Sequence, residues 1–316
     1  MKLTEISART PAGAENYKPV MVREGVNVMM ASHPLIRLLE FYDMVGDAEY
    51  VETESDATGG TGRQKGSNFN AGEEEREYAT PALKIFGDSK TIDQAEQRRG
   101  KNMNNFSTRV LRRLSRGIGR NFVGRLIDGT ASTTMWDGIA TICPAGQKIA
   151  LATNGAVFPR GNSDSNRAAQ QAFFEALDEV IAMISGDVSA LLVNSKLHSR
   201  ITNVYKESFT FPHGETGVGK LLPYYNGTIP FVSMGKDGGK NEILPFSETQ
   251  GTSNTCSSIY GVSLAEGDSL SIGTNTGFNV YYSKSDEKYR MTEEGDFVPT
   301  LFDDEAIAAL TGIKVA

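Results

Sequence analysis

The chain has 316 residues, of which 39% are hydrophobic and 22% charged, and its formal net charge is −7. This composition is typical of a folded protein of one large or two ordinary domains, and the acidic balance argues against a protein that coats nucleic acid with its whole surface. Two cysteines, Cys143 and Cys256, are too few for a disulfide scaffold, and no apolar run approaches the ~20 residues that span a bilayer, so we expect structural thiols in a cytoplasmic product that contacts no membrane.

The first 44 residues mix short apolar stretches with polar ones. Pro11, Pro19 and Pro34 interrupt regular structure. A short amphipathic helix is predicted over residues 33–42, with Pro34 in its first turn and its leucines on one face. The segment therefore predicts an arm that lies on another part of the protein and has no core of its own.

Residues 45–87 predict a long hairpin. Residues 48–54 and 77–86 can each form an extended strand. Residues 58–67, between them, have almost no apolar side chains and cannot bury themselves. Their glycines invite the reading of a phosphate-binding loop, but the G-x-x-x-x-G-K-[ST] pattern is missing. The pattern favours two strands that carry a polar tip away from the body.

A long helix is predicted over residues 91–128, because apolar residues recur there at intervals of three or four. Thr91 is the expected cap at its start, and Gly129 follows its end. Glycines lower helix stability by up to ~1 kcal/mol each relative to alanine. We therefore expect a bend or interruption, placed near Gly100.

The polar face of this predicted helix is basic, although the chain is acidic. Residues 93–128 contain nine basic residues and three acidic ones. One interpretation is a face near DNA phosphates, where non-specific charge suffices. The other is a set of partners for acidic hairpins and neighbouring subunits, or a solvated face. The residues assigned to this face are Arg98, Arg99, Arg109, Arg112, Arg113, Arg116 and Arg120.

From about residue 130 the pattern alternates between helix and strand. An amphipathic helix is predicted over residues 164–185, followed by a buried strand over 189–193. Asn194 or Ser195 then caps a second helix. Further strands are predicted over residues 229–233, 257–264, 269–272, 278–282 and 289–302, with a short closing helical turn within 303–310.

A search for catalytic patterns finds none that is specific. The three histidines, His33, His198 and His213, are far apart and match no metal-binding spacing. Ser195 lies near His198, but no nucleophile-elbow pattern surrounds it, so we expect a helix cap. We therefore expect no catalytic, cofactor-binding or metal-binding residues.

Two other features have ordinary structural interpretations. Neighbouring carboxylates, such as Glu293 and Glu294 or Asp303 and Asp304, point to opposite faces of a strand, and we expect solvated surface charge there. Trp136, the one tryptophan, is expected to anchor a turn or an edge of the core.

The order of these parts resembles that of the major capsid proteins of tailed double-stranded DNA phages. An N-terminal arm precedes a long hairpin, a basic-faced long helix and a mixed α/β region. Local strings also fit the family: a helix end and the turn after it, a buried strand leading into a helix, a loop with a glycine before a strand, and late strands. These strings are residues 126–129 with 136–139, 191–195, 222–233, 258–262 and 304–310.

The resemblance implies an α+β protein with the Hong Kong 97-type capsid fold. Its parts are called the N-arm, the extended β-hairpin or E-loop, the P-domain with its long spine helix, and the mixed α/β A-domain. The implied boundaries are 1–44 for the N-arm, 45–87 for the E-loop, 88–135 for the spine helix, 136–275 for the A-domain, and 276–316 for the P-domain return strands and C-terminus.

The resemblance also implies a function. The chain is expected to form hexamers and pentamers that close into an icosahedral head shell around a phage genome of double-stranded DNA, in a virion assembled in the bacterial cytoplasm. Scaffold and portal proteins are the implied partners, and a decoration protein is compatible with this. The alternatives are an encapsulin-type compartment with the same fold and, from another class, an α/β enzyme with a mobile flap at residues 45–87.

In the family the hairpin lies on a neighbouring subunit. The residues expected at that contact are Arg63, Lys65, Glu73, Glu74, Glu75 and Glu77. The arm begins close to Met1, so we expect a separate scaffold or none. Some members form Lys-to-Asn isopeptide bonds between subunits, but no matching asparagine follows Asn279, and we do not predict that crosslink.

Overall fold

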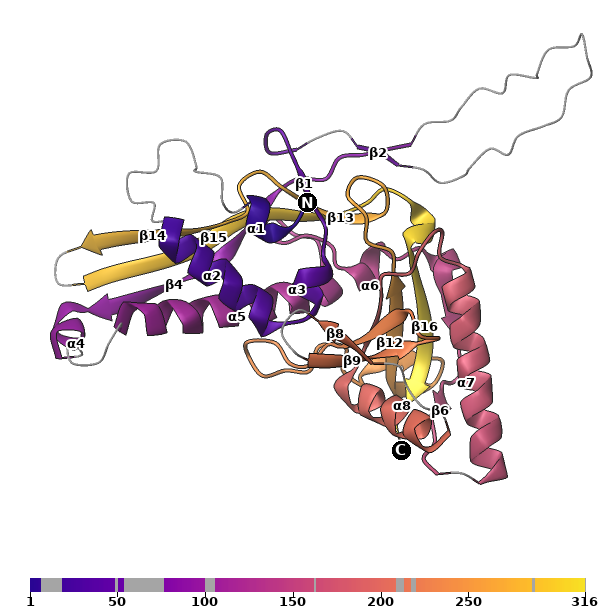
Figure 1. The fold of residues 1–316 in the computed structure, drawn as a ribbon. Helices are drawn as coiled ribbons and strands as arrows, with labels where there is room; N and C mark the ends of the chain where they lie inside the picture. Colours follow the sequence, from indigo (N-terminus) through magenta and orange to yellow (C-terminus); the bar gives the residue numbers. More distant parts are fainter. Residues whose placement is uncertain are drawn as a thin grey trace, which may run out of the picture.

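The computed structural model describes residues 1–6, 19–48, 51–53, 77–99, 106–161, 163–208, 213–216, 220–285 and 288–315. In these residues the chain forms a five-stranded sheet, a nine-stranded sheet and a two-stranded ribbon. Figure 1 shows the first sheet as part of an elongated limb and the second sheet at the other end of the molecule. Among the described residues, no helix has both the length and the apolar character needed to cross a membrane.

The first sheet is organised around one long strand, β15 (Lys288–Leu301). Its buried and half-buried residues alternate over the first part of the strand, so one face is turned to the core. The strand order is β1-β13-β15-β14, and β4 pairs with β15 as well. The other strands are β1 (Phe41–Asp43), β4 (Lys84–Asp93), β13 (Leu270–Thr274) and β14 (Phe278–Ser285).

Two helices lie along this sheet, α2 (Pro19–Ser32) and α5 (Phe106–Asp128) (Figure 1). The buried residues of α5 recur every three or four positions, as the sequence predicted. The helices approach closely at glycines: a Cβ on Gly119 of α5 would lie 3.3 Å from the Cα of Met29. The short helices α1 (Leu3–Ile6), α3 (Leu35–Leu38), α4 (Gln94–Arg99) and α6 (Ile139–Ile142) complete the limb and its junction.

An aromatic cluster joins α5 to the first sheet. The ring of Phe122 lies 5.2 Å from that of Phe297 and 5.8 Å from those of Phe278 and Trp136, all near edge-to-face. Such pairs contribute about 0.5–1.5 kcal/mol each beyond burial of their area. Trp136 is buried at 3% exposure, which confirms its expected role as a core anchor.

The second sheet has the order β5-β16-β12-β7-β10-β9-β8, with β11 paired to β12 and β6 to β16. Its strand β7 (Ala190–Val193) is fully buried, and α7 (Asp164–Ala182) and α8 (Ser195–Ser208) belong to the same part of the molecule. The remaining strands are β5 (Lys148–Ala150), β6 (Ala156–Val157), β8 (His213–Thr216), β9 (Lys220–Tyr225), β10 (Ile229–Ser233), β11 (Glu248–Gln250), β12 (Ser253–Val262) and β16 (Ile307–Lys314).

Polar side chains cap both helices of this region, and only the cap before α8 was predicted. Ser163 accepts a hydrogen bond from the backbone N–H of Asn166 at the start of α7. Of the two candidates before α8, Asn194 is the cap, because its Oδ1 accepts from the N–H of Lys196 at 2.7 Å. The predicted strands over 229–233, 257–264, 269–272, 278–282 and 289–302 all occur, the first with the predicted ends and the others with shifted ends.

The N-terminal segment differs from the prediction. The expected helix over residues 33–42 is wrong beyond Leu38, since Tyr42 belongs to β1, which pairs in parallel with β13. Helix α2 was not predicted at all. Pro19 was taken as an interruption, but it occupies the first position of α2, where a missing N–H is tolerated. Val22, Val26 and Met29 enter the main core, so this segment contributes to the core it covers.

The start of the predicted long helix is also wrong. Thr91 lies in β4, whose pairing with β15 continues as far as Asp93 opposite Lys288. The β-branched residues Thr91 and Ile92 suit a strand, and the long partner strand extends it. Asp93 instead accepts from the N–H of Ala95 at the start of α4. Gly100 lies outside the described residues, between α4 and α5.

The chain end differs too. A 3-10 turn, η3 (Asp304–Ala306), occupies part of the predicted closing turn, but residues 307–314 form strand β16. This strand lies between β12 and β5 in the second sheet, whereas β13, β14 and β15 belong to the first. The sheets therefore do not follow the implied boundary at residue 275, because the chain returns to the second sheet after β15.

Candidate interaction surfaces

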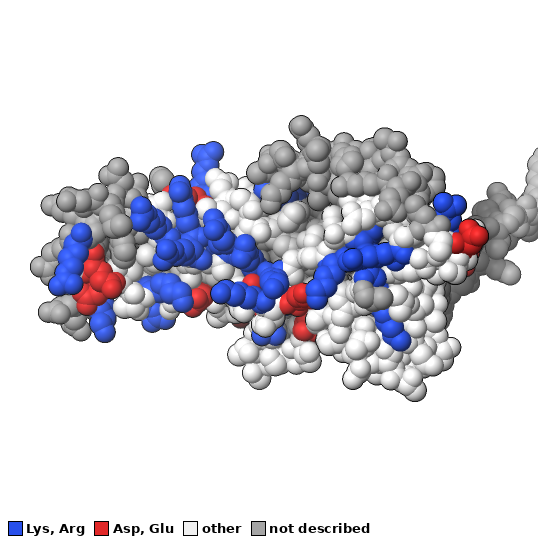
Figure 2. All heavy atoms as spheres, turned by 90° about the horizontal axis from the view of Figure 1, so that it is seen from below, with Lys and Arg blue, Asp and Glu red and all other residues white. Residues whose placement is uncertain are grey.

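A stripe of arginines runs along the outer face of α5. Arg109, Arg112, Arg113, Arg116 and Arg120 are all exposed. At ~100° per residue, these five side chains fall within an arc of about 100° around the helix. We call these five residues the arginine stripe. Figure 2 shows Lys and Arg side chains gathered on this side of the limb.

Few carboxylates neutralise the stripe. Arg112 donates from Nε to Oε1 of Glu24 on α2 at 2.9 Å. In the part of the chain that the structure describes, no carboxylate lies within ion-pair distance of Arg109, Arg113, Arg116 or Arg120. The stripe therefore presents uncompensated positive charge, which attracts polyanions or acidic segments without a need for sequence readout.

Two of the arginines assigned to this face lie elsewhere. Arg99 is exposed but belongs to α4, which is separate from α5. Arg98 is on α4 too, and its side chain lies outside the described residues. Arg125 is exposed on α5, yet it points ~140° away from Arg120 and is not part of the stripe.

A groove of about 1130 Å³ lies beside the stripe, between α5, β4 and the loop of residues 237–245. Arg113 belongs to both the stripe and the groove wall. Apolar side chains and charges of both signs line the groove, and Asp88 and Lys90 form an ion pair of 3.3 Å there. A Cβ added at Gly117 of α5 would meet nothing within 4 Å, so the groove is open at this point.

The loop wall of the groove is held firmly. Its Gly238 N–H donates to Oδ1 of Asn121 on α5 at 2.8 Å. The carbonyl of Leu244 accepts from Asn194 Nδ2 at 2.7 Å and from Ser257 Oγ at 3.1 Å. These contacts maintain a positive φ of 58° at Leu244, which a leucine adopts only when its surroundings impose it.

The predicted hairpin is described only at its base. β2 (Val51–Thr53) and β3 (Glu77–Ala79) pair antiparallel, with Thr53 opposite Glu77, and Ala48 bridges to Ala82. Figure 1 shows this ribbon leaving the molecule beside the first sheet. Glu77 is in β3, but its side chain lies outside the described residues, as do the predicted contact residues Arg63, Lys65, Glu73, Glu74 and Glu75.

The serine and histidine of α8 do not form a nucleophile–base pair. Ser195 Oγ contacts Ser233 Oγ at 2.9 Å and accepts from the N–H of Gly235 at 3.1 Å. Burial lowers the pKa of His198, and its Nε2 has no hydrogen-bond partner among the described residues. Within the described ranges, no group of three or more His, Cys, Asp or Glu could hold a metal ion.

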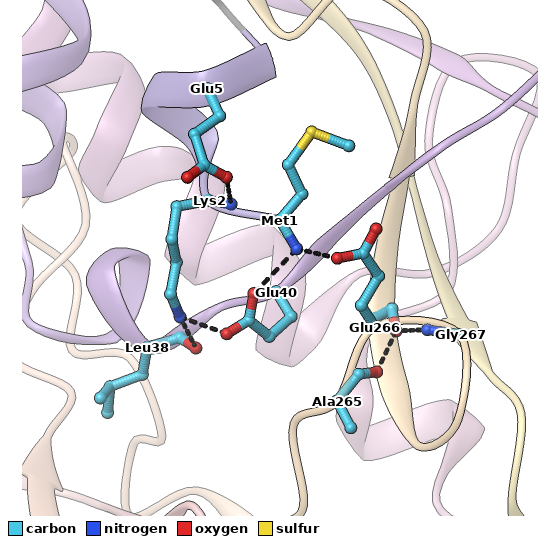
Figure 3. Close-up of polar contacts among 9 residues, drawn as sticks. Met1, Lys2, Glu5, Leu38, Glu40, Ala265, Glu266 and Gly267 are labelled. Atoms are coloured by element: carbon cyan, nitrogen blue, oxygen red, sulfur yellow. Dashed lines mark hydrogen bonds and ion pairs between the residues drawn. The ribbon is translucent and has the colours of Figure 1, made fainter.

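The amino terminus is bound by two carboxylates, as Figure 3 shows. The Met1 ammonium contacts Glu40 at 3.1 Å and also Glu266, and Lys2 Nζ contacts Glu40 as well. Burial lowers the pKa of the Met1 amine, but Glu266 and Glu40 outweigh it and raise that pKa. This cluster attaches α1 to the segment before β1 and to the loop before β13.

One buried carboxyl was not anticipated. Glu293 was expected at the surface, but its exposure is 0%, because β15 turns it toward α2 and α5. Burial raises the pKa of Glu293 to about 7, although a hydrogen bond from Ser115 lowers it. Glu294, on the other face of the strand, is half-buried. The two residues differ in burial because helices cover the strand face that carries Glu293. No local sequence pattern indicates which face is covered.

Both cysteines are buried, and neither forms a disulfide. Burial raises the pKa of the Cys143 thiol to about 11, with a smaller opposing effect of Lys148. This thiol is therefore protonated at neutral pH and has little nucleophilic character. The described structure agrees with the expected structural role for Cys143.

No protein-family model matches the sequence, and no curated protein is similar to it in sequence. Solved structures are similar in fold. The chain matches the holo-SrpI encapsulin complex from Synechococcus elongatus PCC 7942 at 12% identity and a TM-score of 0.62, over 89% of this chain and 87% of that one.

Two capsid structures match over even more of the chain. The capsid of the native GTA particle is 12% identical, with a TM-score of 0.57 over 98% of this chain and 96% of that one. The satellite phage P4 procapsid is 12% identical, with a TM-score of 0.54 over 92% of this chain and 98% of that one. The chain therefore has the α+β Hong Kong 97-type fold that its sequence predicted.

Proposed function

We propose that this chain is a structural subunit of a closed protein shell, the head shell of a tailed phage that encloses double-stranded DNA. The observation that carries the proposal is the fold match to the capsid of the native GTA particle over 98% of this chain. A match of that extent includes the limb, the second sheet and the ribbon base. In this proposal the subunits form hexamers and pentamers of a virion, and the chain is not an enzyme.

The contact between subunits is proposed to use the groove beside α5. Its rim carries Asp88 and Asp237 as well as Lys90 and Arg113. The hairpin segment of a neighbouring copy carries charges of both signs, with Arg63 and Lys65 in one part and Glu73, Glu74 and Glu75 in another. Each exposed ion pair adds ~0–1 kcal/mol, but closed symmetry repeats every contact around the shell.

The arginine stripe is proposed to face the packaged DNA. Its support is the cluster of exposed arginines, of which Arg112 alone has a carboxylate partner among the described residues, on an otherwise acidic chain. Contact with phosphates through charge alone is independent of sequence, as a container for a whole genome requires. The other candidate for the stripe is the acidic part of a neighbouring hairpin, and the two make different predictions for DNA binding. Scaffold, portal and decoration proteins are further proposed partners.

An encapsulin-type compartment is the second candidate, favoured by the TM-score of 0.62 to the SrpI encapsulin. The contents of purified shells distinguish an encapsulin-type compartment from a phage head. Shells of a phage head, isolated from infected or induced cells, would hold double-stranded DNA, whereas a compartment would hold a protein cargo. Nuclease digestion and mass spectrometry of purified shells measure both.

The test of the shell itself is sedimentation velocity and negative-stain microscopy of the full chain over a range of concentrations and salt. We expect closed shells, or rings of five or six subunits. A chain that remains a monomer or dimer throughout, and also when expressed with the other head proteins of its genome, would contradict the proposal.

A further inference from the structure

Glu293 lies at the meeting point of three elements. It comes from β15, and α5 and α2 cover it. The hydroxyl of Ser115 on α5 donates to its Oε2 at 2.7 Å. A Cβ added at Gly25 of α2 would lie 2.9 Å from its Oε1, so the backbone of α2 lies directly over the carboxyl.

The second oxygen of this carboxyl is unsatisfied. Oε1 of Glu293 has no hydrogen-bond partner among the described residues. A protonated carboxyl tolerates such a position far better than a carboxylate, because burial without a partner disfavours the charged form most. The single donor, Ser115, cannot replace the hydration that an ionised carboxylate has in water.

Within the described residues, no neighbouring cation compensates a negative charge on this carboxyl. On α2, Arg23 is exposed and Glu24 pairs with Arg112 of α5 at 2.9 Å. Arg116 of α5 is exposed as well. None of these guanidinium groups forms an ion pair with Glu293 in the described part of the chain.

The strands on either side bring no cation to Glu293 either. The residue opposite it on β14 is Val280, which is apolar. The residue opposite it on β4 is Asp88, which is exposed and pairs with Lys90 at 3.3 Å. Among the described residues, the helices therefore offer Glu293 one neutral donor, Ser115, and the neighbouring strand positions offer it no cation.

Movement of α5 away from Glu293 would separate the aromatic rings that join it to the first sheet, whereas movement of α2 would not. α5 forms the aromatic cluster with β14 and β15, and β15 is the central strand of its sheet. α2 is a 14-residue helix from the N-terminal segment; it packs mainly on α5 and β14, with α1 and α3 beside it, and reaches Glu293 of β15 at Gly25. Water reaches Glu293 at the lowest structural cost if α2 separates from α5.

We propose that α2 is a pH-sensitive strap: it stays packed on α5 and β15 while Glu293 carries a proton, and it opens more often when this carboxyl ionises. The sign follows from linkage. With α2 packed, burial raises the pKa of Glu293 to about 7, against 4.5 for a solvated glutamate carboxyl. Packing is therefore most stable below the solvated pKa and weakens as pH rises toward the packed pKa.

The test is hydrogen exchange of the α2 backbone in the full chain, measured from about pH 5 to about pH 9 and corrected for intrinsic exchange rates. For the unchanged protein we expect the opening constant of α2 to increase by roughly a hundredfold over this range. Glu293→Gln has the same shape and no charge, so its opening constant should be low and independent of pH. Glu294→Gln, on the other face of β15, is the matched control and should behave like the unchanged protein.

Other titrating groups are separated by the same comparison. His33, which follows α2, has its Nε2 3.0 Å from the carbonyl of Met234, and any pH dependence from it would persist in Glu293→Gln. If the unchanged protein and Glu293→Gln share one pH profile, the proposal is wrong. Should Glu293→Gln fail to fold, Ser115→Ala replaces it: loss of the donor should steepen the pH dependence of α2 opening, and an unaltered profile would equally overturn the proposal.

Discussion

Ser115 and Glu293 are 178 residues apart in the chain, yet their side chains form a buried hydrogen bond of 2.7 Å between helix α5 and strand β15. It is the one hydrogen bond that the described structure shows for this carboxyl. The bond therefore links the helix layer to the sheet layer at a point where the core is otherwise apolar. Its contribution depends on the protonation state of Glu293, which makes it measurable.

Removal of this donor should cost more at high pH than at low pH. A hydrogen bond to a charged group contributes about 1.5–3 kcal/mol, and one between neutral groups about 0.5–1.5 kcal/mol. We expect Ser115→Ala to lower the free energy of unfolding by the larger amount above pH 7, where Glu293 is ionised, and by the smaller amount near pH 5. Urea unfolding at the two pH values measures this. In the Glu293→Gln background the difference between the two pH values should disappear, and an equal loss at both pH values in the original background would contradict the expectation.

Two glycines of α5 should respond to alanine in opposite directions. A Cβ at Gly119 would meet Ser32 Oγ at 2.6 Å and Met29 Cα at 3.3 Å, so Gly119→Ala should push α2 away and destabilise the protein by ~1–3 kcal/mol. A Cβ at Gly117 meets nothing within 4 Å, so Gly117→Ala should stabilise the helix by up to ~1 kcal/mol. Thermal unfolding of both variants under one buffer condition measures the pair. Equal effects of the two substitutions would show that α2 does not approach α5 at Gly119.

The arginine stripe should be dispensable for folding and required for DNA contact. We expect the combined change of Arg109, Arg113, Arg116 and Arg120 to Gln to leave the unfolding midpoint nearly unchanged, because the four side chains are exposed and unpaired within the described structure. Binding of the full chain to random duplex DNA should weaken, and its salt dependence should fall by ~0.9 per lost phosphate contact.

Arg125→Gln, on the same helix but off the stripe, is the control for this set. It should leave the salt slope of DNA binding as it is. If the four-residue variant binds DNA with an unchanged slope but fails to assemble, the stripe contacts a neighbouring acidic segment in place of DNA.

The hairpin tip should matter for assembly and not for the fold of one subunit. Residues 58–67 contain almost no apolar side chains, so their deletion removes little that a single chain could bury. We expect the deletion variant to keep the unfolding midpoint of the full chain and to lose shell formation, as measured by sedimentation velocity and negative-stain microscopy. Closed shells of ordinary size from this variant would contradict the proposed role of the hairpin.

Much of the architecture could be predicted because it has a local cause. The spacing of Leu114, Ile118 and Phe122 predicted the buried face of α5, and the apolar run at β7 followed by Asn194 predicted a buried strand and a capped helix. The arginine stripe was predicted for the same reason, since residues that recur at helical intervals share a face in any helix that includes them.

What failed depended on partners distant in the chain. Thr91 belongs to β4 because β15 is long enough to pair with it. Residues 307–314 form β16 because they pair with β12 on one side and β5 on the other. The groove beside α5 also has no local signal, since its walls come from α5, β4 and the loop of residues 237–245.

The sequence alone therefore determined the periodic elements, the basic face of α5 and the paired base of the hairpin, because each depends on spacing between near neighbours. Only the tertiary structure decided that Glu293 is buried while Glu294 is partly exposed, although both are glutamates on one strand. The physical reason is that strand alternation assigns the two residues to opposite faces without saying which face a helix covers. Helices α2 and α5 pack over the face of β15 that carries Glu293, and this packing buries its carboxyl.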